Sequence, residues 1–121
     1  MCIRDRIIAT RKLTVVTKSG RDPDVAIRLF LPEGAEERWT CRYEMDFLED
    51  GWPAQTVKGY AVGSDALHAL QLAMQKLGVE LHMTSYHTDR TMRWGHWGGY
   101  GIALPKEGRD LMRGDDAKFF G

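Results

Sequence analysis

The chain has little of what most directly indicates a function. Its 121 residues include only 2 cysteines, so no disulfide framework is expected and a reducing, cytoplasmic setting is favoured. No apolar stretch approaches the roughly 20 residues that span a bilayer. The 17 Lys and Arg residues balance 17 Asp and Glu residues, and no basic run is present that would attract phosphates. We therefore expect neither a membrane nor a nucleic acid as partner.

Motifs for the common catalytic chemistries are also missing. There is no Gly-x-Ser-x-Gly elbow and no glycine-rich phosphate loop before a helix. Four metal-capable side chains lie in one region: His82, His87, Asp89 and His96. Their spacing matches no known ligand pattern, so we predict no metal and no cofactor. We expect Cys41, on the inward side of a strand, to be buried rather than nucleophilic.

What the chain does have is one clear helical pattern between Ser64 and Leu81. Large apolar side chains recur along it every three or four residues: Leu67, Leu70, Met74, Leu77 and Leu81. This spacing aligns them on one helix face, and Ser64 is suited to cap the first turn. Gly78 leaves two alternatives open. The helix either ends there or continues to about Met83, and we favour continuation.

Four other segments have the composition or alternation of strands. They cover residues 7–17, 25–31, 39–48 and 54–62. The third alternates most clearly, which predicts one face in the core and one in water. The predicted fold class is therefore α+β, a four-stranded antiparallel meander with one long helix packed on one face. The expected core residues are Leu13, Val15, Ile27, Leu29, Cys41, Tyr43, Met45, Leu67, Leu70, Met74 and Leu77.

The turn before the last of these strands leaves two registers open. A two-residue Asp-Gly turn would point Tyr60 and Val62 toward the core. An odd-length loop centred on Gly51 would instead point Gly59 inward, opposite Tyr43. We favour the second register, because small residues let a helix approach closely and an aromatic ring can cover a bare glycine.

The two ends of the chain differ from its middle. Residues 1–6 resemble the translation of a sequencing adapter, so we expect an artefact there and a source in an environmental bacterial assembly. Residues 7–104 are predicted to form a single domain. Residues 105–121 are predicted to be a polar C-terminal tail with at most one helical turn, at 109–112.

Three short patterns resemble those of a known family. They are W-x-C-x-Y-E at Trp39 to Glu44, G-x-D-A-x-x-A-L-x-L-A at Gly63 to Ala73, and a Trp followed by glycines and G-I-A-L-P at Gly101 to Pro105. Together they are similar to a family of small bacterial domains of unknown function. The resemblance covers most of the chain after residue 6. Its motifs are structural, so it implies no activity.

The segment from Tyr86 to Gly101 alternates glycines with aromatic residues and follows neither a helix nor a strand period. We expect a loop, with one short strand near Met92 to Trp94. Trp94 is predicted to pack inward and Trp97 to be more exposed. The aromatic residues either cap one end of the sheet or form a binding surface, since Trp, Tyr and Arg dominate binding hot spots. The candidate binding residues are Tyr86, His87, Arg90, Arg93, His96, Trp97 and Tyr100, and no residue is assigned as catalytic.

Two functions from different classes remain open at this point. The small size, the balanced charge and the lack of a catalytic motif favour a non-catalytic interaction protein, of immunity or accessory type, that binds another protein. The alternative is a small enzyme or ligand binder that uses His87, His96 and Arg93 in a pocket beside the helix.

Overall fold

The computed structural model describes residues 6–18, 20, 22–48, 52, 55–95, 97, 99–102, 104 and 114–120. Most of the adapter-like segment 1–6, the helical turn expected at 109–112, and His96 lie outside these ranges. Along the described chain the strands are β1 (Ile7–Val15), β2 (Asp24–Phe30), β3 (Glu33–Ala35), β4 (Arg38–Asp46), β5 (Thr56–Gly63) and β6 (Met92–Arg93). The helices are α1 (Ala66–His82), α2 (Ser85–Thr88) and α3 (Gly114–Phe120).

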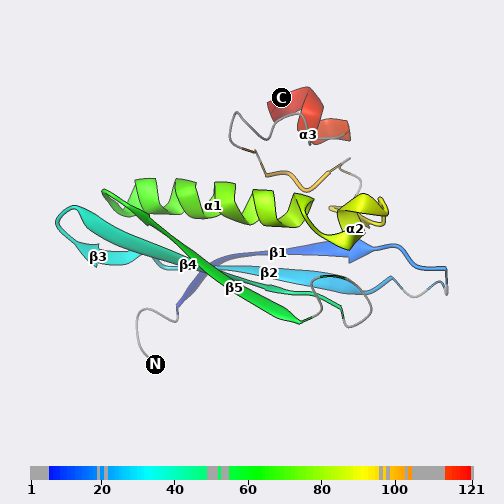
Figure 1. Ribbon diagram of the computed structural model, residues 1–121, viewed down its shortest axis with the longest axis horizontal. Coiled ribbons are helices and arrows are strands. Elements are labelled where there is room, and N and C mark those ends of the chain that lie inside the picture. The colour runs from blue at the N-terminus through cyan, green and yellow to red at the C-terminus, as the bar shows by residue number, and fades with distance from the viewer. Residues whose placement is uncertain are drawn as a thin grey trace.

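The strands form one antiparallel sheet with α1 lying across one of its faces (Figure 1). Strands β1, β2, β4 and β5 are successive antiparallel neighbours, as the meander predicts. The number of strands was wrong, because the described part of the sheet has six. Strand β3 pairs with β4 beyond the end of β2, and β6 pairs with β1. The short strand expected near Met92 to Trp94 is β6, whereas β3 was not predicted and, at three residues, is too short to show an alternating pattern.

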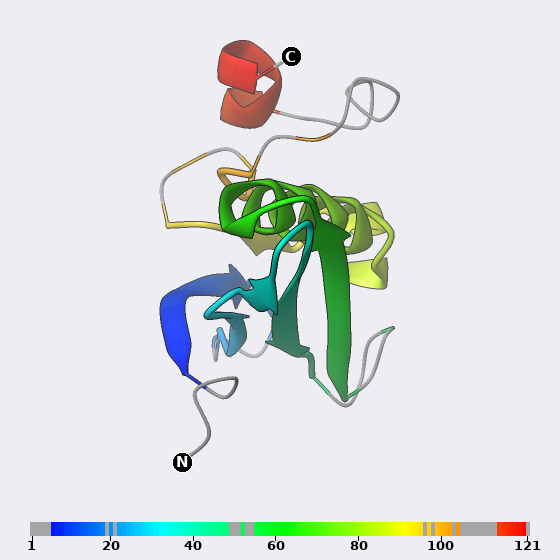
Figure 2. The same ribbon diagram turned by 90° about the vertical axis from the view of Figure 1, so that its left-hand side faces the viewer.

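The predicted register between β4 and β5 is confirmed. Tyr43 pairs with Gly59, while Tyr60 and Val62 are exposed on the other side of the strand. Seen along the sheet, β1 and β5 lie on opposite sides beneath α1 (Figure 2). The helix therefore crosses the region where the small inward residues of β5 leave room for it.

Helix α1 continues through Gly78 and ends at His82, with Met83 as its C-cap, so the favoured alternative is confirmed. Its N-cap is Asp65 rather than Ser64. The Asp65 carboxylate accepts a hydrogen bond from the backbone N–H of His68 at 2.7 Å. A carboxylate suits this position because it satisfies a free N–H at the positive end of the helix.

The predicted buried face of α1 was partly wrong. Leu67 is 64% exposed and Met74 is 42% exposed, whereas Leu77 is buried as expected. The face that meets the sheet is centred on small residues, and its buried members are Ala69, Ala73, Leu77, Gly78, Leu81 and His82. A side chain on Gly63 would collide with the backbone of Ala69, so β5 and α1 are in close contact there. That approach requires the alanine stripe to face the strand.

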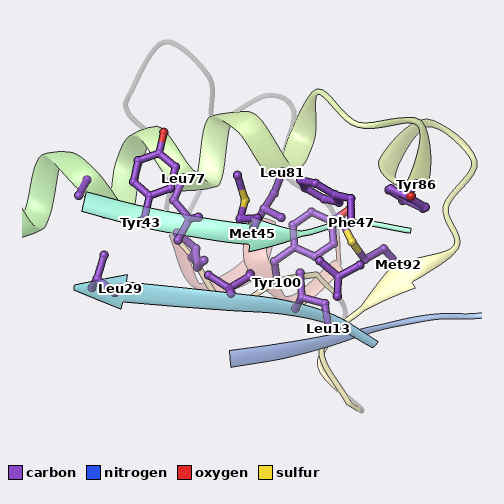
Figure 3. Close-up of a cluster of buried hydrophobic side chains, with 14 of the residues drawn as sticks. Leu13, Leu29, Tyr43, Met45, Phe47, Leu77, Leu81, Tyr86, Met92 and Tyr100 are labelled. Carbon is purple, nitrogen blue, oxygen red and sulfur yellow. The ribbon is translucent and has the colours of Figure 1, made fainter. Parts of the chain in front are cut away.

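The remaining core prediction is confirmed. The predicted strand residues are all buried: Leu13, Val15, Ile27, Leu29, Cys41, Tyr43 and Met45. Leu70 is half-buried against this cluster. Buried side chains of β1, β2, β4 and β6 form this cluster with those of α1, and Phe47, Met92 and Tyr86 gather at one end of it (Figure 3). That end, beside the last turn of α1, is where polar side chains also enter the interior.

Candidate functional site

A pocket of about 290 Å³ opens at the C-terminal end of α1. Its walls come from α1, from α2, from the segment between Asp89 and Gly101, which we call the aromatic loop, and from α3. The lining residues are His82, His87, Arg90, Met92, Gly99, Tyr100, Gly114 and Asp116. We call this the histidine pocket. Its volume is near the lower end of the range for small-molecule sites.

Two buried histidines and a buried tyrosine form one wall of the pocket. The Nδ1 atom of His87 lies 2.5 Å from the hydroxyl of Tyr100. The rings of His82 and His87 are 4.6 Å apart between centroids, and His82 meets the edge of Tyr100 at 5.0 Å. His82 Nδ1 is 2.7 Å from the carbonyl of Gly78. Because a carbonyl only accepts, this contact places a proton on Nδ1 of His82.

Arg90 stands at the same pocket and is solvent-exposed. Its backbone N–H donates to the carbonyl of His87 at 3.1 Å, which closes the turn after α2. Its φ angle is +57°, in the left-handed region that side chains other than glycine seldom adopt. The backbone of Arg90 is therefore strained at a position that glycine would occupy more easily. Backbone strain of this kind often occurs at functional positions.

Helix α3 contributes the fully buried carboxylate of Asp116 to the lining of the pocket. Asp116 accepts three hydrogen bonds, from the indole N–H of Trp97 at 2.6 Å and from the backbone N–H groups of Tyr100 and Gly101 at 2.7 and 2.8 Å. A side chain on Gly99 would collide with this carboxylate. The glycines of the loop thus let the backbone close around Asp116, which fixes the loop against α3.

The other side of the loop is held by Arg11 of β1. Its guanidinium lies over the ring of Trp94, 3.7 Å from the centroid. It also donates hydrogen bonds to the carbonyls of Tyr100 and Gly101, at 2.9 and 3.2 Å. Burial lowers the pKa of Arg11, while the charge of Asp116 acts in the opposite direction. Trp94 packs against the core as predicted, and Trp97 is half-buried with its ring nitrogen bound.

The structure brings together some of the predicted binding residues and separates others. His87, Arg90 and Tyr100 line the histidine pocket. Tyr86 is buried, with its ring stacked on Phe47 and its hydroxyl bound to the backbone of Leu48. Arg93 is exposed on β6 and is not among the lining residues, and His96 lies outside the described residues.

Sequence reasoning assigned no binding role to three residues at the site. His82 lies on the buried face of α1. It follows Gly78 by four residues, so the helical period places both on the same face, next to Leu81. Arg11 and Asp116 are separated from the loop by about 90 and 15 residues in the chain, so no local pattern connects them to it. The hydrogen-bonding demand of the loop's backbone is a signal that could have pointed to distant partners, since buried N–H and C=O groups need them.

Within the described ranges, no group of three or more His, Cys, Asp or Glu side chains is placed to hold a metal ion. No described helix is long and apolar enough to cross a membrane. The polar side chains that line the histidine pocket carry imidazole, phenol, guanidinium and carboxylate groups, the last from Asp116.

A family model described as a domain of unknown function, DUF6968, matches residues 9–105. The chain belongs to the DUF6968 family. No match was found among curated proteins or among solved structures. The DUF6968 region includes the sheet, α1, α2 and the aromatic loop, and thus most of the histidine pocket. Its membership confirms the predicted resemblance to a small domain family of unknown function.

Proposed function

We propose that this domain is a non-catalytic binding protein that takes a small carboxylate with a planar apolar body in the histidine pocket. The observation that carries the proposal is the convergence of His82, His87, Tyr100 and Arg90 on one pocket of about 290 Å³. The sequence suggested such a pocket only as an alternative, and with Arg93 rather than Arg90.

The charge of the pocket supports an anion as ligand. Arg90 supplies an exposed guanidinium, whose fork of N–H groups matches a carboxylate. Asp116 carries the opposing charge, but three N–H groups already surround its oxygens and Arg11 attracts it. Arg90 is therefore the exposed cationic group among the lining residues, whereas the Asp116 carboxylate is buried.

The side chains that line the histidine pocket indicate that the ligand has an aromatic body. Met92, Tyr100 and the two histidines place a thioether and three aromatic rings around the pocket, against which an aromatic ring can pack. A pocket with a few convergent polar groups on mostly apolar walls is typical of small-molecule sites.

Substitutions at Arg90 and Arg93 test the proposal. The probe is benzoate, and neutral benzamide is its control. Benzoate should shift the amide resonances of Arg90 and Met92, and Arg90→Gln should weaken this binding by about tenfold or more, since a charge-assisted pair is lost. Arg93→Gln removes an equal charge three residues away and should leave the affinity unchanged. Equal binding of benzoate and benzamide, or equal effects of the two substitutions, would contradict the proposal.

The interaction-protein function favoured by the sequence is a second candidate, and one observation supports it. Strand β5 pairs only with β4 in the described part of the sheet, and Tyr60 and Val62 on it are exposed. An open strand edge with exposed apolar side chains suits strand addition by a protein partner of accessory or immunity type. Copurification with the product of a neighbouring gene, lost in Val62→Lys but kept in Lys58→Ala, would support this candidate.

A further inference from the structure

A second pocket of about 290 Å³ lies on the other side of the last turn of α1. Its lining residues are Met45, Phe47, Trp52, Val57, Glu80 and Met83. We call it the Trp52 pocket. Glu80 and His82 are two residues apart on the helix, so their side chains point in nearly opposite directions. The two pockets are therefore separate.

The Trp52 pocket is apolar except for one carboxylate. Glu80 is half-buried, and its Oε2 accepts a hydrogen bond from the hydroxyl of the fully buried Tyr43 at 2.7 Å. Burial and this carboxylate raise the pKa of Tyr43, so the phenol stays a donor. Of the cationic side chains that the structure describes, none forms an ion pair with Glu80. Among the described residues, the Glu80 carboxylate thus borders an apolar pocket without a cationic side chain at ion-pair distance.

The rim of the pocket is fixed although it is exposed. Trp52 is 65% exposed. Its backbone N–H donates to the hydroxyl of Ser85 at 2.8 Å, and its carbonyl accepts from the N–H of Ser85 at 2.8 Å. Nearby, both backbone groups of Leu48 bind the hydroxyl of Tyr86. Four hydrogen bonds to α2 therefore fix the backbone groups of Leu48 and Trp52, while the Trp52 side chain faces water.

We propose that the Trp52 pocket binds a small organic amine with an apolar body, whose ammonium group pairs with Glu80. A carboxylate that already accepts a bond from Tyr43 has lone pairs left for a second donor. The face of an indole attracts cations, and a fixed Trp at a pocket rim is typical of a binding hot spot. The apolar walls from Met45, Phe47 and Val57 would receive the body of the amine.

The methionines of the protein allow a direct test with 2-phenylethylamine as the probe. Its ammonium form should shift the methyl resonances of Met45 and Met83, which line the Trp52 pocket, and leave that of Met92, which lines the histidine pocket. The neutral analogue 2-phenylethanol should bind about tenfold more weakly, since a hydrogen bond to a charged group is lost.

Substitutions assign the binding to the named groups. Glu80→Gln keeps an acceptor for Tyr43 and should weaken amine binding by about tenfold. Glu37→Gln, in the exposed turn before β4, should have no effect. Trp52→Ala removes a mostly exposed side chain, so the fold should persist while amine binding falls several-fold.

Several results would overturn the proposal. Equal affinity for the amine and the alcohol, or unchanged amine binding in Glu80→Gln, would show that the carboxylate is not its counterion. Shifts at Met92 alone would place the amine in the wrong pocket. A concentration-dependent dimer that protects Trp52, with no response to the amine, would mean that a second copy of the chain occupies the surface.

Discussion

Tyr43 lies opposite Gly59 on the paired strands β4 and β5, and its ring fills the space that a side chain at position 59 would occupy. Since Tyr43 is fully buried, the ring has little room to move. Gly59→Ala should therefore lower the free energy of unfolding by about 1–3 kcal/mol, as overpacking does. Lys58→Ala, at the adjacent exposed position, should change it by less than about 0.5 kcal/mol. Urea denaturation measures both, and equal effects would contradict the packing.

The two faces of α1 give a second prediction. Leu77 is buried between the helix and the sheet, so Leu77→Ala should lower the free energy of unfolding by about 2–5 kcal/mol. Leu67→Ala, on the exposed face, should cost less than about 0.5 kcal/mol, and Leu70→Ala should fall between the two. Thermal and urea unfolding of the three variants would test this order. The reverse order would mean that the helix is rotated.

Asp46 should contribute stability that depends on pH. The guanidinium of Arg28, followed by the hydroxyl of Thr56, lowers the pKa of Asp46 to about 2. An unfolded Asp titrates near about 3.9, so this contribution is present above that pH and is lost as pH falls through about 2. The side chain is 42% exposed, so Asp46→Asn should cost no more than about 1 kcal/mol at neutral pH.

Urea unfolding of both proteins across the acid range would measure this difference. The gap between wild type and Asp46→Asn should close as the pH approaches about 2, because the wild-type carboxyl is then protonated as well. Asp89→Asn, at an exposed position, provides the control substitution. A stability difference that widens toward acid pH would contradict the lowered pKa of Asp46.

Asp116 should control the order of the aromatic loop. Asp116→Ala leaves three N–H groups without their acceptor, which should destabilise the folded state by about 3 kcal/mol. Amide hydrogen exchange should accelerate most at Tyr100 and Gly101, whose N–H groups it binds. Asp89→Ala, at an exposed position, should leave their exchange unchanged. Unchanged exchange in Asp116→Ala would mean that α3 does not fix the loop.

Cys41 should be protected from alkylation in the folded protein. Burial raises the pKa of its thiol to about 11, and its Sγ lies 3.5 Å from the carbonyl of Phe30. Iodoacetamide reacts with an accessible thiolate. At mildly alkaline pH the Cys41 sulfur is buried and its thiol stays protonated, so neither condition is met. Peptide mass spectrometry should find Cys41 unmodified in native protein and modified in urea. Rapid modification of the native protein would contradict the burial.

The sequence predicts the buried face of the sheet better than that of the helix. The reason is that side chains recur on one face every two residues along a strand but every 3.6 residues around a helix. A strand has only two faces, so one buried residue such as Cys41 determines the rest, and the choice of Gly59 opposite Tyr43 follows from one steric argument. A helix presents a continuous surface, and its largest apolar residues need not be its buried ones. Here Leu67 and Met74 point outward because Gly63 brings the small side of α1 onto β5.

The histidine pocket was less predictable, because its members are joined by contacts over long separations in the chain. A loop rich in Trp, Tyr and Arg indicated a region, and His87, Arg90 and Tyr100 do meet there. The polar partners that decide the geometry are Arg11 from the first strand and Asp116 from the last helix. No spacing rule connects either to the loop, and neither belongs to a local motif.

The residues that line the histidine pocket come from two parts of the chain, the family domain and helix α3. The DUF6968 match ends at residue 105, whereas Gly114 and Asp116 line the pocket from beyond it. The sheet and α1 make no use of these two residues for their own hydrogen bonding. Exchange of Asp116 would therefore reshape one side of the pocket and also release the N–H groups that it binds, while the contacts between the sheet and α1 stay in place. In this architecture, a change of ligand preference on this side is coupled to the order of the aromatic loop.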